Sequence, residues 1–292
     1  MALDKPEAVC LGVVLALVGV SSAVGESQPT RSYTNHVRAG DVGSNGPLGC
    51  GKAVALAGGF ANEFNRRTSR LFLFGFNPTG KTADAPFPGT PIPGGPTWRV
   101  TVANLADDGA GRQRTFVYCG PRRAGLMLRE RRVRIPPSGS ATATATCPVG
   151  TEAVSGGFSD KWAGTRGALV FGFRSHRLGR RRWRASAVNT SDAIASTLIV
   201  MANCDPLRPR LTARTVSARM PAHGRRSLAA DCGAGRSAWS AGFESPVEDW
   251  ARGGAFPYLF KRVRHRSWRA AAFSVGASPT RFTLHAYCGK PR

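Results

Sequence analysis

The chain has 292 residues, of which 42% are hydrophobic and 20% are charged, and its formal net charge is +24. This composition is that of a folded protein rather than a disordered chain, and the length allows one large domain or two to three small ones. Only six of the 41 basic residues are lysines, so arginine supplies the other 35.

The N-terminus carries an apolar run, AVCLGVVLALVGVSSAVG, from Ala8 to Gly25, with small residues at its end. This pattern predicts a secretory signal peptide over residues 1–25, cleaved after Ala23 or Gly25. The alternative is a retained membrane anchor, because the run is long enough to span a bilayer. No later segment is as long and apolar, so we expect an exported protein that is secreted or associated with the cell envelope.

Three tryptophans lie at intervals of 85 residues: Trp98 in TWRVTVAN, Trp183 in RWRASAVN and Trp268 in SWRAAAFS. Each tryptophan opens an alternating segment, and an apolar strand ending in cysteine follows 20 or 21 residues later. A cysteine and a Gly-Phe phrase precede each tryptophan, in CGKAVALAGGF, CPVGTEAVSGGF and CGAGRSAWSAGF. A fixed internal period is the signature of a repeat architecture.

The repeats predict three units, which span residues 30–122, 123–207 and 208–292. The first unit has an insertion at 77–97, which contains the Pro/Gly-rich sequence NPTGKTADAPFPGTPIPGGPT and is expected to be a loop.

Six cysteines remain outside the predicted signal, two at matching places in each unit. Repetition leaves two symmetric pairings, one within units and one between neighbouring units. We favour pairing within units because it makes each unit self-sufficient: Cys50–Cys119, Cys147–Cys204 and Cys232–Cys288. The cysteines lack CxxC spacing and nearby histidines, so we predict no metal site and no cofactor.

Short alternating segments bounded by turn residues predict an all-β protein. Each unit is expected to hold five or six antiparallel strands, with Trp183 pointing inward beside Phe158 and Phe171. The units either pack as three sheets about a pseudo-threefold axis, like a β-prism, or form three tandem β-sandwiches; we lean to the prism, which limits exposed strand edges. The predicted core markers are Phe60, Trp98, Phe158, Trp183, Phe243 and Trp268.

The phrase CPVGTEAVSGGF, followed by WRASAVN and a strand ending in cysteine, resembles a repeat found in exported proteins of high-GC bacteria and at the end of some collagen-like chains. The Cys-Pro-x-Gly and Gly-Phe elements also resemble, at lower similarity, the vitelline membrane outer layer proteins, which are three-sheet β-prisms. The resemblance spans nearly the whole chain after the predicted signal, and it implies a fold and export rather than an activity.

Gly75 to Thr82, GFNPTGKT, matches the phosphate-binding loop pattern GxxxxGK[ST]. A phosphate loop requires a helix directly after Lys-Thr, and here ADAPFPGTPIPGG places prolines where that helix should run. No GxSxG elbow is present, and the five histidines share no metal-like spacing. Carboxylates such as Asp107, Asp108, Glu248 and Asp249 are expected in turns, so we predict that the protein is not an enzyme.

Two basic hairpins, FRSHRLGRRRWR and FKRVRHRSWR, occupy equivalent places in the second and third units. Clustered guanidinium groups attract polyanions and bind phosphate or carboxylate bidentately. The alternative is a solvated charged face in a host that prefers arginine codons. The candidate polyanion-binding residues are Arg174, Arg177, Arg180, Arg181, Arg182, Arg262, Arg264 and Arg266.

The sequence therefore favours a non-catalytic binding or structural protein of the cell envelope or extracellular space. The expected partners are an anionic cell-wall polymer, an acidic glycan or an anionic lipid surface, with nucleic acid bound only nonspecifically. The alternatives are a lectin-like protein that binds neutral glycans and, less favoured, a secreted hydrolase. The sequence indicates no oligomeric state.

Overall fold

The structure is a computed structural model that describes residues 30–65, 69–79, 97–121, 125–160, 170–246 and 254–291. The predicted signal peptide and most of the 77–97 insertion lie outside the described residues. Within the described residues the regular elements are nineteen β-strands, which confirms the all-β prediction. No helix of the described part has the length and apolarity needed to cross a membrane.

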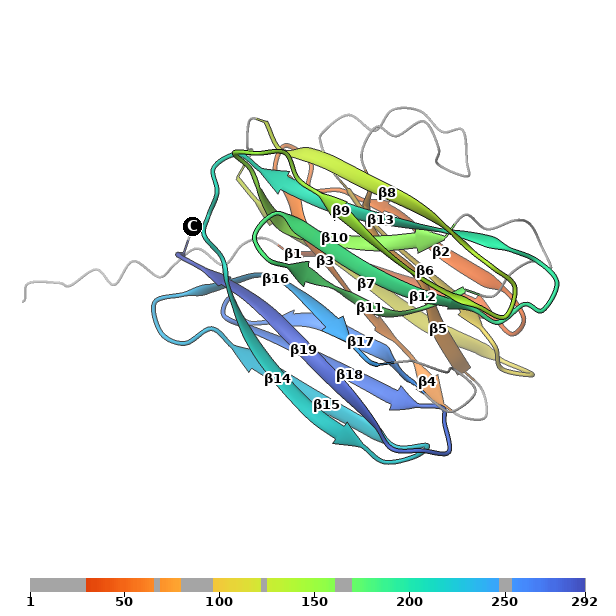
Figure 1. Ribbon diagram of the computed structural model, residues 1–292. Coiled ribbons are helices and arrows are strands. Elements are labelled where there is room, and N and C mark those ends of the chain that lie inside the picture. Colours follow the sequence, from red (N-terminus) through yellow and green to blue (C-terminus); the bar gives the residue numbers. More distant parts are fainter. Residues whose placement is uncertain are drawn as a thin grey trace, which may run out of the picture.

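The strands fall into three groups that match the three sequence repeats (Figure 1). The first repeat contains β1 (Thr30–Arg38), β2 (Val42–Leu48), β3 (Val54–Asn62), β4 (Phe64–Asn65), β5 (Ser69–Thr79), β6 (Thr97–Asn104) and β7 (Ala110–Gly120). The second contains β8 (Met127–Ile135), β9 (Ser140–Thr146), β10 (Glu152–Asp160), β11 (Val170–Leu178), β12 (Arg182–Asn189) and β13 (Ser196–Asp205). The third contains β14 (Thr212–Met220), β15 (Arg225–Asp231), β16 (Ser237–Glu244), β17 (Ala255–Val263), β18 (Ser267–Ser274) and β19 (Thr280–Gly289).

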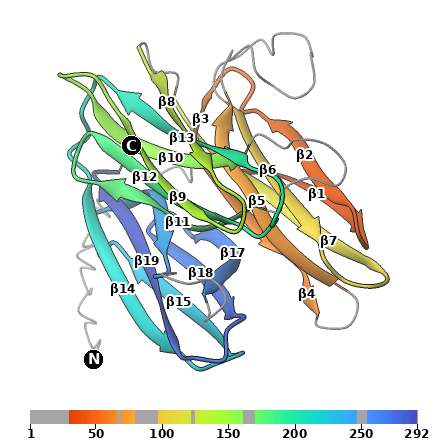
Figure 2. The ribbon, with the colours of Figure 1, turned by 45° about the vertical axis from the view of Figure 1, so that its right-hand side comes forward.

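Each repeat gives three strands to one sheet and three to another, and the first repeat has in addition the short strand β4, which pairs with β5 (Figure 2). The first sheet has the order β1-β7-β3-β17-β18-β15, the second β2-β6-β5-β10-β13-β8 and the third β14-β19-β16-β11-β12-β9. The first and third sheets therefore join three strands of one repeat to three of another, and the second sheet joins β2, β6, β5 and the additional strand β4 of the first repeat to three strands of the second repeat. This sharing excludes three separate tandem sandwiches and gives the prism-like arrangement of three sheets.

The repeats meet at three seams, which we define as the central strand pairs β3–β17, β5–β10 and β11–β16. Each seam has a register of only one or two residue pairs, for example Phe158 opposite Phe76 in the second sheet. The Gly-Phe phrase explains how the strands come this close. A Cβ on Gly59, Gly157 or Gly242 would lie within 2.6 Å of a backbone carbonyl oxygen of the neighbouring repeat, so only glycine fits.

The disulfides confirm the predicted pairing within repeats: Cys50–Cys119, Cys147–Cys204 and Cys232–Cys288. Each bridge ties the two half-sheets of one repeat, because its first cysteine follows a strand of one sheet and its second lies on a strand of another. The bridged cysteines are 69, 57 and 56 residues apart. Loops of this size each contribute about 4 kcal/mol in the chain-entropy account.

The six predicted core aromatics are all buried, with at most 1% of each side chain exposed. Phe171 corrects one prediction, because it does not pack beside Trp183. It lies opposite Val188 on β12, whereas Trp183 lies opposite Arg177, six residues further along β11. Phe171 instead joins a second hydrophobic cluster.

Three phenylalanines from equivalent positions of the three repeats form the centre of this second cluster. Phe72, Phe171 and Phe256 have ring centroids 5.2 to 6.0 Å apart in every pairing. Each directly follows a residue that pairs with the Asn or Ser at the end of the tryptophan strand. This mutual contact of three equivalent side chains places the pseudo-threefold axis through the middle of the molecule.

Candidate functional site: the basic end and the third seam

The β11–β12 hairpin presents the first group of predicted arginines. Gly179 in its turn has a φ of 65°, a left-handed conformation that glycine adopts readily. Arg181 ties the turn to the disulfide, since its carbonyl oxygen accepts a hydrogen bond from the Cys147 N–H at 2.7 Å and its Nε donates to the Cys147 carbonyl at 3.1 Å. Arg180, Arg181 and Arg182 are exposed.

Arg177 is placed inside the protein. Its Nη2 lies 2.5 Å from Oε1 of Glu152, a carboxylate that is 1% exposed, and its Nη1 donates to the Leu211 carbonyl at 3.2 Å. Glu152 also accepts the backbone N–H groups of Arg210 and Leu211 at 2.8 and 3.0 Å. Arg180 approaches the same carboxylate at 3.4 Å. This network fastens the linker between the second and third repeats, so Arg177 is engaged in holding the fold.

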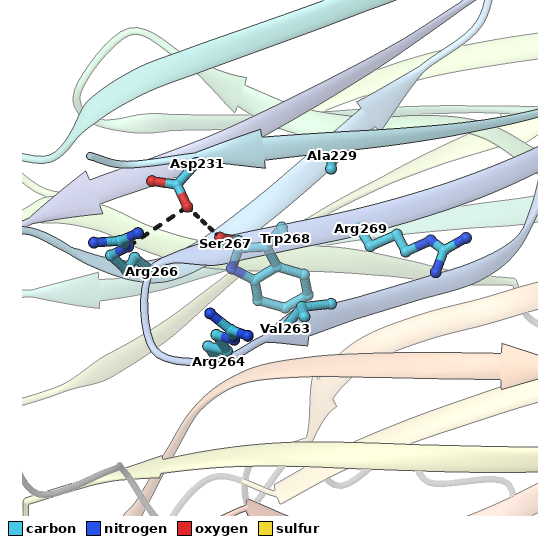
Figure 3. A pocket seen from close by; sticks show the side chains of 8 residues that line it. All are labelled: Ala229, Asp231, Val263, Arg264, Arg266, Ser267, Trp268 and Arg269. Atoms are coloured by element: carbon cyan, nitrogen blue, oxygen red, sulfur yellow. Dashed lines mark hydrogen bonds and ion pairs between the residues drawn. The ribbon is translucent and has the colours of Figure 1, made fainter. Parts of the chain in front are cut away.

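The β17–β18 hairpin carries the second group of predicted arginines. The Arg262 guanidinium lies 4.5 Å from the ring centroid of Tyr118, and its backbone N–H donates to the Tyr118 hydroxyl at 2.7 Å. Burial lowers the pKa of Arg262, while the nearby Tyr118 opposes this shift. Arg264 and Arg266 lie on the turn, and in the view of Figure 3 both lie to the left of the buried Trp268.

The hollow beside this hairpin has a volume of about 300 Å³ and is lined by Arg264, Arg266 and Arg269. It also contains a carboxylate, since Asp231 faces Arg266 at 3.6 Å and accepts a hydrogen bond from Ser267 at 2.5 Å (Figure 3). The pKa of Asp231 is lowered, first by the Ser267 hydrogen bond and then by the backbone N–H of Gly233. An ionised Asp231 offsets part of the positive charge of these arginines. We therefore expect this hollow to bind anions more weakly than a basic cavity that has no carboxylate.

A larger cavity of about 870 Å³ lies where the connections between repeats converge. Its wall includes Pro121 from the first connection, residues 207–210 from the second, and residues 289–291 near the C-terminus. Its lining contains four cationic side chains and no carboxylate among the described residues: Arg208, Arg210, Arg236 and Lys290.

The cavity and both hairpin turns lie at the same end of the molecule. Each turn hydrogen-bonds to the first cysteine of a disulfide, through Arg181 to Cys147 and through Arg266 to Cys232. The second cysteine of each bridge then leads directly into a segment that lines the cavity. We call this region the basic end and define it by Arg180–Arg182, Arg208, Arg210, Arg236, Arg264, Arg266 and Lys290.

Sequence reasoning missed Arg208, Arg210, Arg236 and Lys290, because they lie outside the two hairpins. The sequence does contain a signal for three of them. Proline and basic residues follow the second cysteine of every repeat, in CGPRR, CDPLRPR and CGKPR. Pseudo-threefold packing brings such equivalent segments together, and the repeat alignment could have identified this cluster.

The phosphate-loop match and the carboxylates singled out from the sequence lie elsewhere. Gly75 to Thr79 continue strand β5 and pair with β6, so this part of the match is extended sheet. Asp107 and Asp108 are exposed between β6 and β7. Glu248 and Asp249 lie outside the described residues.

A second polar cluster lies on the outer face of the third sheet, at the β11–β16 seam. His176 on β11, Glu244 on β16 and His285 on β19 point their donor atoms at one another. Oε2 of Glu244 lies 3.9 Å from Nε2 of His176 and 3.7 Å from Nε2 of His285. Arg174, another of the predicted arginines, binds Oε1 of the same carboxylate at 2.8 Å.

Comparison with protein-family models and with curated proteins found no match for this chain.

Proposed function

We propose that this protein is a non-catalytic binding protein that holds an anionic polymer at its basic end. The observation that carries the proposal is the cavity of about 870 Å³ with four cationic side chains and no carboxylate among its described lining residues. Guanidinium groups bind phosphate and carboxylate in a bidentate geometry, and a concave basic surface concentrates the field.

The place of action that we propose is the cell envelope or the extracellular space. The three disulfides are typical of proteins from oxidising compartments. The proposed signal peptide supports export. A protein outside the cell meets phosphate-rich wall polymers, acidic glycans and anionic lipid surfaces, all of which present the phosphate or carboxylate groups that arginine binds.

Retention on immobilised heparin and on an anionic cell-wall polymer tests the proposal. The basic-end variant carries Arg182→Ser, Arg208→Ser and Arg210→Ser. The matched control removes the same amount of charge. It replaces three exposed arginines that lie toward the opposite ends of their strands: Arg134→Ser, Arg219→Ser and Arg226→Ser. The control residues lie five to seven residues along their strands from the disulfide end, which is roughly 15–25 Å.

We expect the basic-end variant to elute at a clearly lower salt concentration than wild type and the control to shift little. Equal shifts for the two variants would mean that net charge alone causes retention, and the proposal would fail. Binding of a neutral glycan is the alternative outcome. It would persist at high salt and would be unchanged in both variants.

A further inference from the structure

The three seams are equivalent by the repeat, but among the residues that the structure describes only the third seam brings three potential metal ligands together. At the third seam these are His176, Glu244 and His285, contributed by strands of the second and third repeats. The two histidines are 109 positions apart in the chain, so no local sequence motif indicates that they form one site.

The tautomer of His176 leaves its outer nitrogen available. Nδ1 lies 3.1 Å from the Arg177 carbonyl oxygen, which only accepts hydrogen bonds. The proton of the neutral ring is therefore on Nδ1, and Nε2 carries a lone pair. Metal-binding histidines show this arrangement, in which the second ring nitrogen donates to a carbonyl and fixes the ring.

His285, on the neighbouring strand, can adopt the same arrangement. Its Nδ1 lies 3.1 Å from the Thr215 hydroxyl, which can accept a hydrogen bond from Nδ1 as well as donate one, and within the described structure its buried Nε2 has no hydrogen-bond partner. The two imidazoles stack with centroids 5.1 Å apart and an interplanar angle of 22°. Both Nε2 atoms therefore lie on the same side of the seam as Oε2 of Glu244.

The spacing of the three donor atoms suits a first-row divalent ion. All three lie within 4.8 Å of one another. A tetrahedral zinc ion with bonds of about 2.1 Å places its ligand atoms roughly 3.4 Å apart, so modest side-chain rotation would complete the set. The side chains are 13%, 30% and 16% exposed, in chain order, which leaves room for water at the remaining coordination position.

The other two seams show that the fold does not need these side chains. Lys261, Ala61 and Phe116 occupy the equivalent positions in the first sheet, and Asn77, Ser159 and Met201 occupy them in the second. We propose that His176, Glu244 and His285 form a binding site for a first-row divalent transition-metal ion, with Zn²⁺ as its representative. Imidazole and carboxylate ligands suit such ions, whereas magnesium and calcium prefer all-oxygen sites.

Arg174 sets the expected strength of the site. Its guanidinium occupies Oε1 of Glu244 and leaves Oε2 to the histidines. Its charge also balances that of the carboxylate, so a bound dication is not neutralised by the protein. We therefore expect affinity in the micromolar range rather than that of a structural zinc site, and an open position that can take water or an external anion.

The test is Zn²⁺ titration of the untagged full chain by calorimetry, with Co²⁺ absorption as a spectroscopic readout. Wild type should bind one ion per chain. His285→Met and Glu244→Gln should each weaken binding by about tenfold or more, and Co²⁺ should lose its ligand-field bands. Matched controls are His265→Asn on the β17–β18 turn and His36→Asn on β1.

A seam-swap variant keeps the test independent of folding defects. It replaces the cluster with the residues of the second sheet, as His176→Asn, Glu244→Ser and His285→Met. It should remain folded and bind no Zn²⁺ at this site, and its polymer retention in EDTA should stay close to that of wild type. No Zn²⁺ binding by wild type, or equal affinity in wild type and the seam-swap variant, would overturn the proposal.

Discussion

The seams of the first and third sheets join two repeats through the same two contacts of a tyrosine. In the first sheet the Tyr118 hydroxyl accepts the backbone N–H of Arg262, and in the third the Tyr287 hydroxyl accepts that of Arg177, both at 2.7 Å. Each tyrosine ring also packs edge-on against the tryptophan of the neighbouring repeat, with centroids 5.1 and 5.7 Å apart. These shared contacts are what the fold requires of a seam.

The two seams differ in the charged groups around these shared contacts. On the outer face, Lys261 lies 5.9 Å from the ring centroid of Phe116 in the first sheet, where the third sheet has His176 and His285. Below the seam, Ser237 of the third repeat occupies the position that Glu152 occupies in the second. Arg262 accordingly lies closer to its tyrosine than Arg177 does, at 4.5 against 5.9 Å.

The second sheet completes the comparison with a seam that lacks the tyrosine. Asn203 precedes the cysteine there, and it donates to Ser155 of its own repeat at 3.0 Å. On the outer face the Asn77 amide lies 3.5 Å from the Met201 sulfur. The three seams thus carry three different sets of residues on their outer faces, which shows that the outer-face charged residues of the third seam are additions to a common frame.

The largest effect is expected from breaking the Arg177–Glu152 ion pair at the third seam, because Ser237 takes the place of Glu152 at the first seam. Glu152→Ala leaves the buried guanidinium of Arg177 without its carboxylate, and we expect a loss of about 3–5 kcal/mol in the free energy of unfolding. Ser237→Ala is the matched control at the first seam and should cost less than about 1 kcal/mol. Urea unfolding measures both. Similar losses for the two variants would contradict the assigned role of Glu152.

The next effect should be common to both seams. Gly59→Ala and Gly242→Ala each add a Cβ that would lie 2.6 Å from a backbone carbonyl oxygen of the other repeat. Backbone cannot move aside as a flexible side chain can, so we expect each to cost about 2–3 kcal/mol. A control is Gly150→Ala, whose cost should arise from its φ of 82° alone. Neutral behaviour of the seam glycines in thermal unfolding would show that the seams do not depend on close approach.

A smaller and equal effect is expected from the tyrosine hydroxyls. Tyr118→Phe and Tyr287→Phe each leave the backbone N–H of an arginine without its acceptor, at a cost of about 1–2 kcal/mol. Chemical denaturation of the two variants should give free energies of unfolding within about 0.5 kcal/mol of each other, because the two bonds have the same length and both tyrosines are 2% exposed. A large difference would show that the two seams are not equivalent.

Much of the fold is predictable because the strand patterns are local in the sequence and recur in each repeat. Alternation identified the strands, the constant Trp-to-Cys spacing identified the repeats, and equal positions in each copy identified the disulfides. Phe171 was misplaced because a pattern shows that a residue is buried but not its register with the partner strand. The bulge between Gly172 and Arg174 adds to this uncertainty.

The sites were less predictable because they form between repeats. Each seam aligns one or two residue pairs, so no sequence period links His176 to Glu244 and His285. Among the predicted arginines, the sequence could not separate Arg177, which is buried on Glu152, from Arg181, which is exposed. That distinction depends on a carboxylate 25 positions away that the fold brings to one side of the hairpin.

The most direct test of the account is the stability of the seam-swap variant in metal-free buffer. If the histidines and Glu244 are additions to a frame that already holds the seam, exchanging them for Asn, Ser and Met should change the free energy of unfolding by less than about 1 kcal/mol, since partly exposed ion pairs contribute little. A loss of about 3 kcal/mol or more in urea unfolding would show that these side chains hold the third seam together, and would contradict the account.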